Sequence, residues 1–332
     1  MTELPNEYAL VSVGLPVYNG EATLMRAVKS ILSQDYPNIE LVISDNGSTD
    51  GTFEILEDLA SNHANIRIHR SSANRGWTWN ANKVFEQSRG EYFLWAADDD
   101  FYDLTFISSA IKQLECYPSA VLCHPKTKAI IEGGAEIVWR SSLFTFRGVM
   151  NVRQRYKETL RNFPAVAFYG VYRSKLLRNV GTLANIIGSD VVFMQKLSLY
   201  GNFIDTDKEL FTRVIRTNWN TREENLKSYS GTSANFSRIT VRVQSLKQKI
   251  LDIKETPHSA LLKFQLVGLA VHAEIRSAIV KLLCRILIIS IPERFTEQAA
   301  NNLYSKFFKN RNIAPASESL FYSRIILPTL SL

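Results

Sequence analysis

A run of three aspartates has the residue types and the setting of a divalent-cation site. Asp98, Asp99 and Asp100 directly follow the apolar run 92–96. Three adjacent carboxylates repel one another, and a bound cation removes that cost. Mg²⁺ and Mn²⁺ prefer oxygen ligands and bind through carboxylates together with substrate phosphates. Such a cation would neutralise a diphosphate and stabilise it as a leaving group. The alternative is a solvated acidic turn that caps the next helix.

A second polar cluster, residues 45–50, follows another apolar run. Asp45 and Asn46 can accept and donate hydrogen bonds to a base or a ribose, and Gly47 permits a tight turn. The serine and threonine that follow can cap the next helix. By itself, this cluster is explained equally well as a turn and a helix cap.

The elements that must position these clusters alternate between strand and helix. Apolar runs of strand length alternate with stripes of helical spacing, which indicates βαβ units and a largely parallel sheet. In such sheets ligands bind where the carboxyl ends of the strands meet, so the loops at 16–21, 45–50 and 97–103 become the candidates. Strands are expected at 10–15, 39–44, 66–68 and 92–96, and helices at 24–32, 52–60 and 106–114.

After about residue 120 the chain no longer shows a regular alternation of strand and helix patterns. Residues 121–211 mix short strands and helices, and the polar stretch 228–238 is expected to be a linker. Residues 259–291 form a long helical pattern rich in Leu, Ile, Val and Ala, interrupted by charges such as Lys263 and Arg276. Those charges disfavour a transmembrane span. A helix lying at a membrane surface and a helix packing on the domain or on another subunit both stay open.

Length, net charge and cysteine spacing limit the class of protein, its compartment and its partners. The 332 residues can bury one large core or a catalytic domain with an appendage, and the net charge is +7. Three cysteines without CxxC spacing indicate a reducing compartment, and the polar, acidic residues 1–8 argue against a cleaved secretory signal. We therefore expect a cytoplasmic protein, with the inner face of the membrane left open. No nucleic-acid-binding module is recognisable, so nucleic acid is not an expected partner.

Five segments follow one another in a fixed order, and together they indicate a family more specifically than any single segment does. They are residues 16–19, 44–52, 74–76, 90–92 and 97–100. Together they resemble the family 2 glycosyltransferases, inverting enzymes with the GT-A fold, over roughly residues 8–215. The resemblance implies an α/β fold of the GT-A type, with a Rossmann-like, mostly parallel sheet flanked by helices and an α-helical C-terminal extension.

The resemblance also implies a division of the chain and a reaction. The catalytic domain would span 8–227, with a nucleotide-sugar half at about 8–120 and an acceptor half at about 121–227. The helical extension would span 228–332. A nucleoside-diphosphate sugar would be the donor, and a saccharide or a lipid-linked molecule the acceptor, in surface polysaccharide or glycolipid synthesis. Peripheral membrane contact through 259–291 and an oligomer remain open.

Site residues follow from the same resemblance, position by position. Asp45 would bond the base, and Asp98 would face the ribose and the cation, which is Mg²⁺ or Mn²⁺. Asp98, Asp99 and Asp100 are the expected metal ligands. Two positions depart from the family pattern: Asn46 stands where a second Asp is frequent, and Ala97 where an acidic residue often begins the run. The expected nucleotide-sugar contacts are Pro16, Tyr18, Asn19, Glu21, Asp45, Asn46, Arg75, Asn82, Asp98 and Arg213.

An inverting transfer needs a carboxylate that deprotonates the acceptor hydroxyl. Asp190 begins a helical pattern and resembles the second residue of the family's base motif, with Ser189 in place of the frequent Glu. The alternative is an ordinary aspartate stabilised at a helix N-terminus. Two other functions stay open: a nucleotidyltransferase, although no Gly- and Arg-rich loop follows strand one, and a non-catalytic module that binds nucleotide sugars or carbohydrate.

Overall fold

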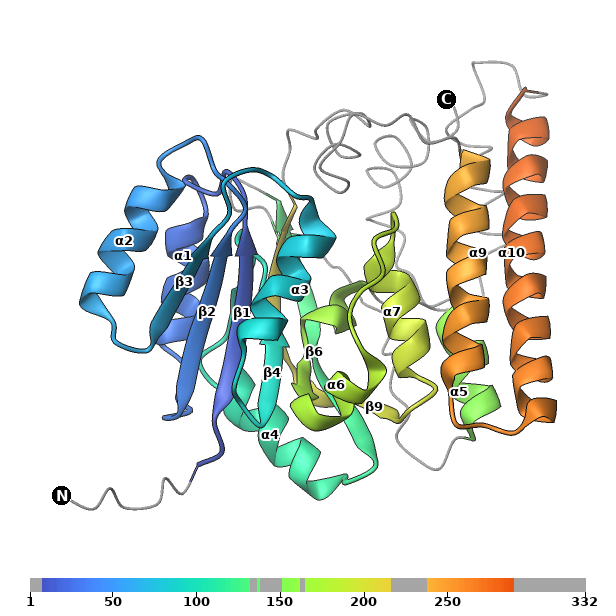
Figure 1. Ribbon diagram of the computed structural model, residues 1–332, viewed down its shortest axis with the longest axis horizontal. Helices are drawn as coiled ribbons and strands as arrows, with labels where there is room; N and C mark the ends of the chain where they lie inside the picture. Colours follow the sequence, from blue (N-terminus) through green and yellow to red (C-terminus); the bar gives the residue numbers. More distant parts are fainter. Residues whose placement is uncertain (1–7, 132–135, 138–150, 162–164, 216–237, 290–332) are drawn as a thin grey trace.

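The computed structural model describes residues 8–131, 136–137, 151–161, 165–215 and 238–289. Within these ranges nine strands form one sheet, in the order β3-β2-β1-β4-β8-β6-β9-β5, with β7 paired to β6 (Figure 1). The strands are β1 (Val11–Val17), β2 (Ile39–Asp45), β3 (Ile66–Arg70), β4 (Tyr92–Trp95), β5 (Phe101–Tyr102), β6 (Ala120–Ile131), β7 (Glu136–Ile137), β8 (Val171–Arg173) and β9 (Asn202–Ile215).

The first four strands form a wholly parallel unit, β3-β2-β1-β4. Val17 at the end of β1 pairs with Asp45 at the end of β2, so the two strands finish side by side. Val, Ile and Leu are frequent in β1 and β2, and β4 is mainly aromatic, because both faces of these three buried strands are covered by helices. The loops that leave their carboxyl ends therefore meet at one edge of the sheet, as expected.

Helices cover the two faces and divide the core into two layers. Alternate residues of β1 pack with α1, α2 and α4, whereas Phe93 and Trp95 of β4 pack with α3, α6 and α7. The helices are α1 (Leu24–Leu32), α2 (Thr52–Asn62), α3 (Trp77–Gln87), α4 (Phe106–Cys116), α5 (Val152–Arg161), the 3₁₀ helix η1 (Ala165–Tyr169), α6 (Ser174–Val180), α7 (Ser189–Leu197), α9 (Arg238–Glu255) and α10 (Ala260–Ile289).

The second part of the sheet is mixed. β8 lies antiparallel between β4 and β6, and β9 runs parallel to β6 and antiparallel to β5. The long strand β9 thus reaches back to the residues that follow the aspartate run. Arg213, one of the expected nucleotide-sugar contacts, lies inside β9.

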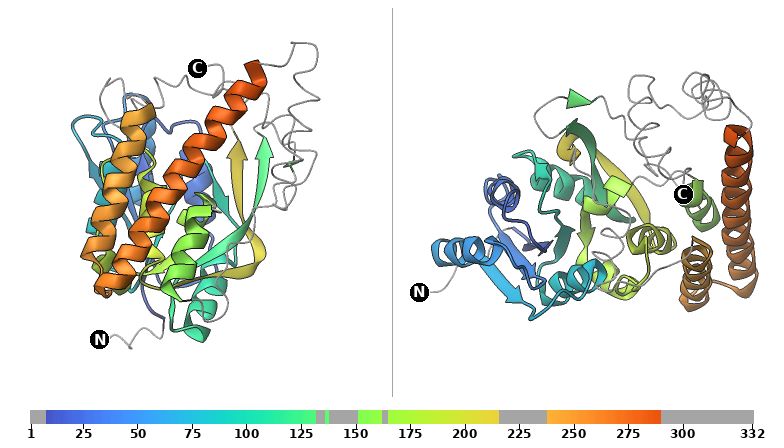
Figure 2. Two further views of the ribbon diagram at one scale, coloured as in Figure 1. Left: turned by 90° about the vertical axis from the view of Figure 1, so that its right-hand side faces the viewer. Right: turned by 90° about the horizontal axis from the view of Figure 1, so that it is seen from above.

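The two last helices described form a pair at the outer edge of the molecule (Figures 1 and 2). Ile253 of α9 and Leu266 of α10 pack with Tyr156 of α5 in a third apolar cluster. Lys249 and Glu274 form an ion pair at 2.6 Å between the two helices. The expected helix at 259–291 corresponds to α10. None of the helices in the described ranges combines the length and the apolarity that crossing a bilayer requires.

The predicted fold class, a sheet of α/β type with an α-helical C-terminal extension, is confirmed. The predicted boundary at 227/228 and nearly all of the predicted linker 228–238 lie outside the described residues. The division of the chain into domains therefore stays a prediction.

Candidate active site

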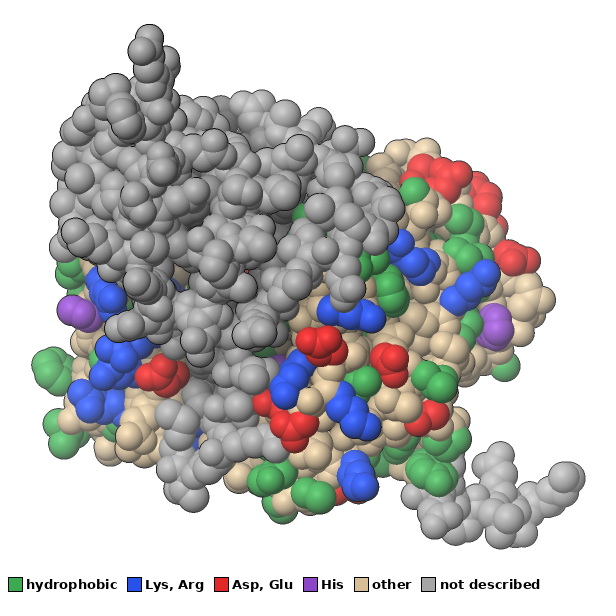
Figure 3. Space-filling model, turned by 180° about the vertical axis from the view of Figure 1, so that it is seen from behind, with side chains coloured by type: hydrophobic (Ala, Val, Ile, Leu, Met, Phe, Trp, Pro, Cys, Tyr) green, Lys and Arg blue, Asp and Glu red, His purple; other side chains and the backbone are tan. Residues whose placement is uncertain are grey.

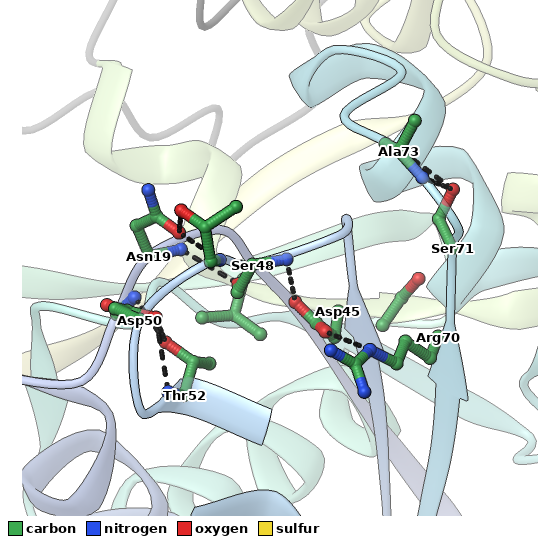
Figure 4. A network of polar contacts seen from close by, with 12 residues as sticks. Asn19, Asp45, Ser48, Asp50, Thr52, Arg70, Ser71 and Ala73 are labelled. Carbon is green, nitrogen blue, oxygen red and sulfur yellow. Dashed lines mark hydrogen bonds and ion pairs between the residues drawn. The ribbon is translucent and has the colours of Figure 1, made fainter. Parts of the chain in front are cut away.

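The loops after β1 and β2 are tied to each other by side chains that the sequence had singled out. Asn19 adopts a positive φ of 53°. Its backbone N–H donates to Ser48 Oγ at 2.9 Å, and its Oδ1 accepts from Thr49 N at 2.9 Å (Figure 4). Glu21 Oε2 accepts from Gly51 N at 3.0 Å. Both side chains are therefore used to hold the two loops together.

Asp45 lies at the end of β2 and is fully buried. Its Oδ1 accepts from Ser48 N at 3.0 Å, and its Oδ2 lies 3.4 Å from Arg70 Nε (Figure 4). The Arg70 guanidinium in turn stacks on the Phe53 ring at 3.7 Å. Apart from this ion pair, Asp45 Oδ2 accepts no hydrogen bond from the described residues, so it can accept one more.

Asn46 fixes the segment before α3. Its Nδ2 donates to Asn74 Oδ1 at 2.9 Å and to Gly76 O at 3.2 Å, and its Oδ1 accepts from Arg75 N at 3.0 Å. The backbone of Gly47 has a φ of 75°, and a Cβ there would lie 2.8 Å from the Ala73 carbonyl carbon. A side chain at this position would thus disturb the close approach of the two segments.

The three aspartates have different surroundings. Asp98 and Asp99 line a cavity at the carboxyl edge of the sheet, whereas Asp100 is 4% exposed and does not line it. Asp100 Oδ1 accepts from Val214 N of β9 at 2.8 Å. Burial, and then the charge of Asp99, raise the pKa of Asp100 to about 7. The placement favours Asp98 and Asp99 as ligands of a cation, while a ligand role for Asp100 stays a prediction.

The cavity has a volume of about 210 Å³ and collects side chains from all three loops. Of the predicted site residues, Pro16, Tyr18, Asn46, Asp98 and Asp99 line it. The remaining predicted residues do not. Three further lining residues, Asn80, Phe168 and Tyr169, have no site role predicted from the sequence. Trp95, for which core packing is the expected use, also lines the cavity. Asn74 and Trp77, which also line the cavity, belong to or follow the segment 74–76 that carried the resemblance.

Three predicted residues sit around the cavity rather than on its wall. The Arg75 guanidinium stacks on the Trp79 ring at 4.3 Å. Asn82 donates to Leu183 O at 2.9 Å and accepts from Leu183 N at 2.8 Å, which joins α3 to the segment before α7. Arg213 is half-buried in β9, and its charge acts on both Asp100 and Asp190.

Asp190 lies in the first turn of α7, directly after Ser189. Ser189 Oγ is 3.2 Å from Thr78 Oγ1, so the start of α7 adjoins the start of α3. Burial raises the pKa of Asp190; the backbone N–H groups of Val191 and Asp190 and the charge of Arg213 act in the opposite direction. A half-buried carboxylate with a raised pKa is a stronger proton acceptor than an exposed one.

The donor set fits a hard divalent cation that is shared with a ligand. The described residues contain no group of three or more Asp, Glu, His or Cys side chains able to hold a metal ion by themselves. Asp98 and Asp99 supply two carboxylates at the cavity wall. Mg²⁺ usually binds with one or two protein carboxylates, while substrate phosphates and water complete its coordination.

Comparison with known families decides the assignment. A family model described as glycosyl transferase family 2 matches residues 12–181, just over half of the 332 residues. The chain belongs to glycosyl transferase family 2. A curated relative of this family 2 chain is the GalNAc(5)-diNAcBac-PP-undecaprenol beta-1,3-glucosyltransferase of Campylobacter jejuni. It is 26% identical over 171 residues, which are 51% of this chain and 53% of that protein. The chain covers only 18% to 37% of the length of three other curated relatives.

Solved structures agree on the fold of this family 2 chain. The S. aureus TarS fragment 1–349 in complex with UDP-GlcNAc matches with a TM-score of 0.61 and 19% identity, over 89% of this chain and 81% of that one. The mannosyltransferase PcManGT of Pyrobaculum calidifontis, in complex with GDP-Man and Mn²⁺, matches with a TM-score of 0.53 and 16% identity, over 98% and 82%. At these identities the likeness confirms the GT-A-like fold.

Proposed function

We propose that this chain transfers a sugar from a nucleoside-diphosphate sugar to an acceptor hydroxyl, with inversion at the transferred carbon. The observation that carries the proposal is the cavity at the carboxyl edge, where Asp98 and Asp99 meet the loops after β1 and β2. Family membership supports it, as do the nucleotide sugars bound by the two solved neighbours. The polar loops would bind the nucleotide, with Asp45 Oδ2 accepting a hydrogen bond from the base.

Asp98 and Asp99 would hold Mg²⁺ or Mn²⁺ against the diphosphate of the donor. The cation, when bound, supplies charge that stabilises the departing diphosphate. The proposal draws support from the placement of the two carboxylates and from the Mn²⁺ in the PcManGT complex. Asp100, bonded to Val214 N, would keep the run in place against β9.

Asp190 would act as the base. The acceptor oxygen forms a bond to the sugar carbon while the bond from that carbon to the diphosphate oxygen breaks. The acceptor proton passes to the Asp190 carboxylate, and the nucleoside diphosphate leaves. Because burial raises the pKa of Asp190, its ionised form is the stronger base, and activity should fall when the pH drops below that raised value.

The acceptor would be a saccharide or a lipid-linked saccharide, within surface polysaccharide or glycolipid synthesis. The undecaprenol-linked substrate in the name of the Campylobacter relative supports this reading. In the same proposal, residues 8–227 are the catalytic domain, with a nucleotide-sugar half at 8–120 and an acceptor half at 121–227, and 228–332 are an extension. The protein would act in the cytoplasm at the inner face of the membrane.

The helical pair would supply the membrane contact. Leu261, Phe264 and Ile275 of α10 are 69%, 79% and 54% exposed. Figure 3 shows hydrophobic and basic side chains next to one another at its left edge, on the side that carries α9 and α10. Anionic vesicles should therefore retain the protein on flotation, and the change Phe264→Ser should weaken retention. Equal flotation with neutral vesicles, or none, would contradict this contact. A concentration-dependent dimer would instead assign the surface to a second copy.

A panel of nucleotide sugars with and without Mn²⁺ tests the main proposal. We expect one nucleotide class to raise the melting temperature only with Mn²⁺, and a sugar product to form with a hydroxyl acceptor. A nucleotidyltransferase would instead form or consume a nucleotide sugar with pyrophosphate. A binding module would show the thermal shift with no product for any acceptor. No shift with any UDP, GDP, CDP or dTDP sugar would refute the proposal.

A further inference from the structure

One side of α1 is hydrogen-bonded to the backbone that leads out of the acidic run. Arg26 Nη2 donates to Asp99 O at 2.6 Å, and its guanidinium lies over the Phe101 ring at 5.4 Å. Ser30 lies one turn further along α1, and its Oγ accepts from Tyr102 N at 3.2 Å. Both hydrogen bonds reach main-chain atoms, so they constrain the path of the backbone and not only the direction of one side chain.

Gln34 makes the same kind of contact just after the end of α1. It lies four positions after Ser30, and its Nε2 donates to Asp103 O at 2.7 Å. Its Oε1 accepts from Ile107 N at 3.0 Å. Residues four positions apart lie on one side of a helix, so Arg26 and Ser30 face the same segment. We call Arg26, Ser30 and Gln34 the α1 row.

The first hydrogen bond of the α1 row lies where the acidic run changes direction. Asp98 and Asp99 line the cavity, whereas Asp100 is buried. Arg26 binds the carbonyl of the peptide between Asp99 and Asp100, and Val214 N of β9 binds the Asp100 carboxylate. Because the direction of a side chain follows from the backbone at its Cα, these two contacts help to keep Asp99 at the cavity while Asp100 points inward.

The start of α1 also approaches the other cavity carboxylate. A Cβ at Gly20 would lie 2.8 Å from Asp98 Oδ2. Gly20 O accepts from the backbone N–H groups of Thr23 and Leu24, so Gly20 opens the turn from which α1 starts. One short segment therefore lies against the Asp98 side chain and, through the first turn of α1, binds the backbone of Asp99.

Groups that hold the ligands of a metal ion in position affect its binding almost as much as the ligands do. Their loss typically weakens metal binding about 10- to 100-fold. Resting on the proposed function, we propose that Arg26 is a positioning residue for the cation site. Its hydrogen bond to Asp99 O holds the acidic run so that Asp98 and Asp99 can share Mg²⁺ or Mn²⁺ with the diphosphate of the donor.

The Mn²⁺ requirement of nucleotide binding tests this role without an assay of turnover. The probe is UDP, or whichever of GDP, CDP and dTDP binds where UDP does not. Calorimetric titrations at a series of Mn²⁺ concentrations give the concentration at which half of the gain in affinity is reached. Arg26→Met should raise that concentration about 10-fold. Arg26→Lys keeps a donor of similar reach and should recover most of the loss. Because Arg26 is exposed, both variants should fold.

Two matched variants separate positioning from charge and from general loss of stability. Lys29→Met removes a positive charge from an exposed position of the same helix and should change the half-saturating Mn²⁺ concentration less than about 2-fold. Gln34→Leu removes the last two hydrogen bonds of the α1 row. It should lower the melting temperature and likewise change the Mn²⁺ requirement less than about 2-fold, because its contacts lie beyond the acidic run.

The outcomes distinguish this inference from the proposed function. An unchanged Mn²⁺ requirement in Arg26→Met, or an equal rise in Lys29→Met or Gln34→Leu, would overturn the positioning role of Arg26 and leave the proposed function standing. Wild-type protein that binds none of the four nucleotides, or binds them equally well in EDTA and in Mn²⁺, would instead refute the proposed cation-dependent function first.

Discussion

The loops at the carboxyl edge of the sheet and the helical pair α9–α10 use acidic side chains in different ways. In the loops, Asp45 accepts from the backbone N–H of Ser48 in its own loop and lies 3.4 Å from Arg70 Nε, and Asp100 accepts from the backbone N–H of Val214 in β9. In the helical pair, Glu274 pairs with Lys249 and Asp252 pairs with Lys196 at 3.2 Å. A backbone N–H fixes the position of a carboxylate without supplying a full positive charge, whereas a lysine partner offsets the charge of the carboxylate.

The net charge of +7 is consequently uneven across the molecule. The cavity keeps two carboxylates at its wall. The acidic residues of the helical pair are matched by lysines, while Lys247 and Lys254 remain exposed. The contrast indicates that the loops at the carboxyl edge are arranged to attract a cation, whereas the helical pair presents basic and apolar surface.

The largest effect is expected at Asp190. The change Asp190→Asn removes the proton acceptor and should lower the rate of transfer about 10²- to 10⁴-fold, since general base catalysis contributes on that order. Donor affinity should stay within 2-fold, because Asp190 does not line the cavity. Initial rates and calorimetric donor binding measure the two effects. Full turnover by the variant would show that another group takes the proton.

Removing an ion pair between α9 and α10 should lower the stability of the protein without changing donor binding at the cavity. The change Glu274→Ala leaves Lys249, whose side chain is 7% exposed, without its ion-pair partner, and should lower the free energy of unfolding by about 3 kcal/mol. Urea unfolding followed by circular dichroism measures this. The control Glu255→Ala removes a 65% exposed carboxylate from its contact with Lys196 and should lower it by less than about 1 kcal/mol. Weaker donor binding in folded Glu274→Ala would mean that the two regions are coupled.

Adjacent aspartates should respond differently to the same change. Asp99→Asn removes a cavity carboxylate and should weaken Mn²⁺-dependent donor binding at least about 10-fold, since even outer partners of metal ligands change affinity by about 10- to 100-fold. Asp100→Asn keeps an oxygen for Val214 N and should change that binding less than 3-fold. Calorimetry with Mn²⁺ and with EDTA compares the two variants. A larger loss for Asp100→Asn would place the cation on the β9 side of the run.

Asp100 should also make stability depend on pH. Its pKa is raised to about 7 in the folded chain, so the folded state binds the proton more tightly than the unfolded state does. The contribution of Asp100 to stability is therefore full at low pH and falls as the pH rises through 7, by about 1.4 kcal/mol for each pKa unit. In EDTA, Asp100→Asn should gain stability over wild type at pH 8 more than at pH 5. An equal difference at both pH values would contradict the assignment.

The sequence predicts which loops meet at the carboxyl edge of the sheet. Apolar runs that alternate with helical stripes specify a parallel sheet, and the end of each strand then locates its loop. Residues 16–19, 45–50 and 97–100 could be placed at one edge for that reason, before any contact was known. The expected role of Asp98 and Asp99 as metal ligands rests on residue type and loop position, and it stays a prediction.

The places of Phe168, Tyr169 and Asn80 at the cavity and the orientation of Asp100 could not be predicted. Phe168 and Tyr169 reach the cavity because η1 packs on β4 and β6, which lie about seventy and about forty residues earlier in the chain, and no local pattern records such contacts. Asn80 reads as an ordinary helix residue, although its amide bridges the ends of β1 and β2. Asp100 turns inward and accepts from Val214 N. No local pattern predicts this contact, because Val214 lies 114 positions further along the chain.

The hydrogen bond between Asp100 and Val214 N makes the position of the acidic run depend on the register of β9, a strand far along the chain. Inserting or deleting one residue of β9 between Asn202 and Val214 would bring a different backbone N–H to the carboxylate and turn Arg213 to the other face of the sheet. A graft of residues 97–100 into another scaffold would therefore transfer the residue types of the motif without the positions of their side chains. The transplantable unit is the acidic run together with the whole of β9.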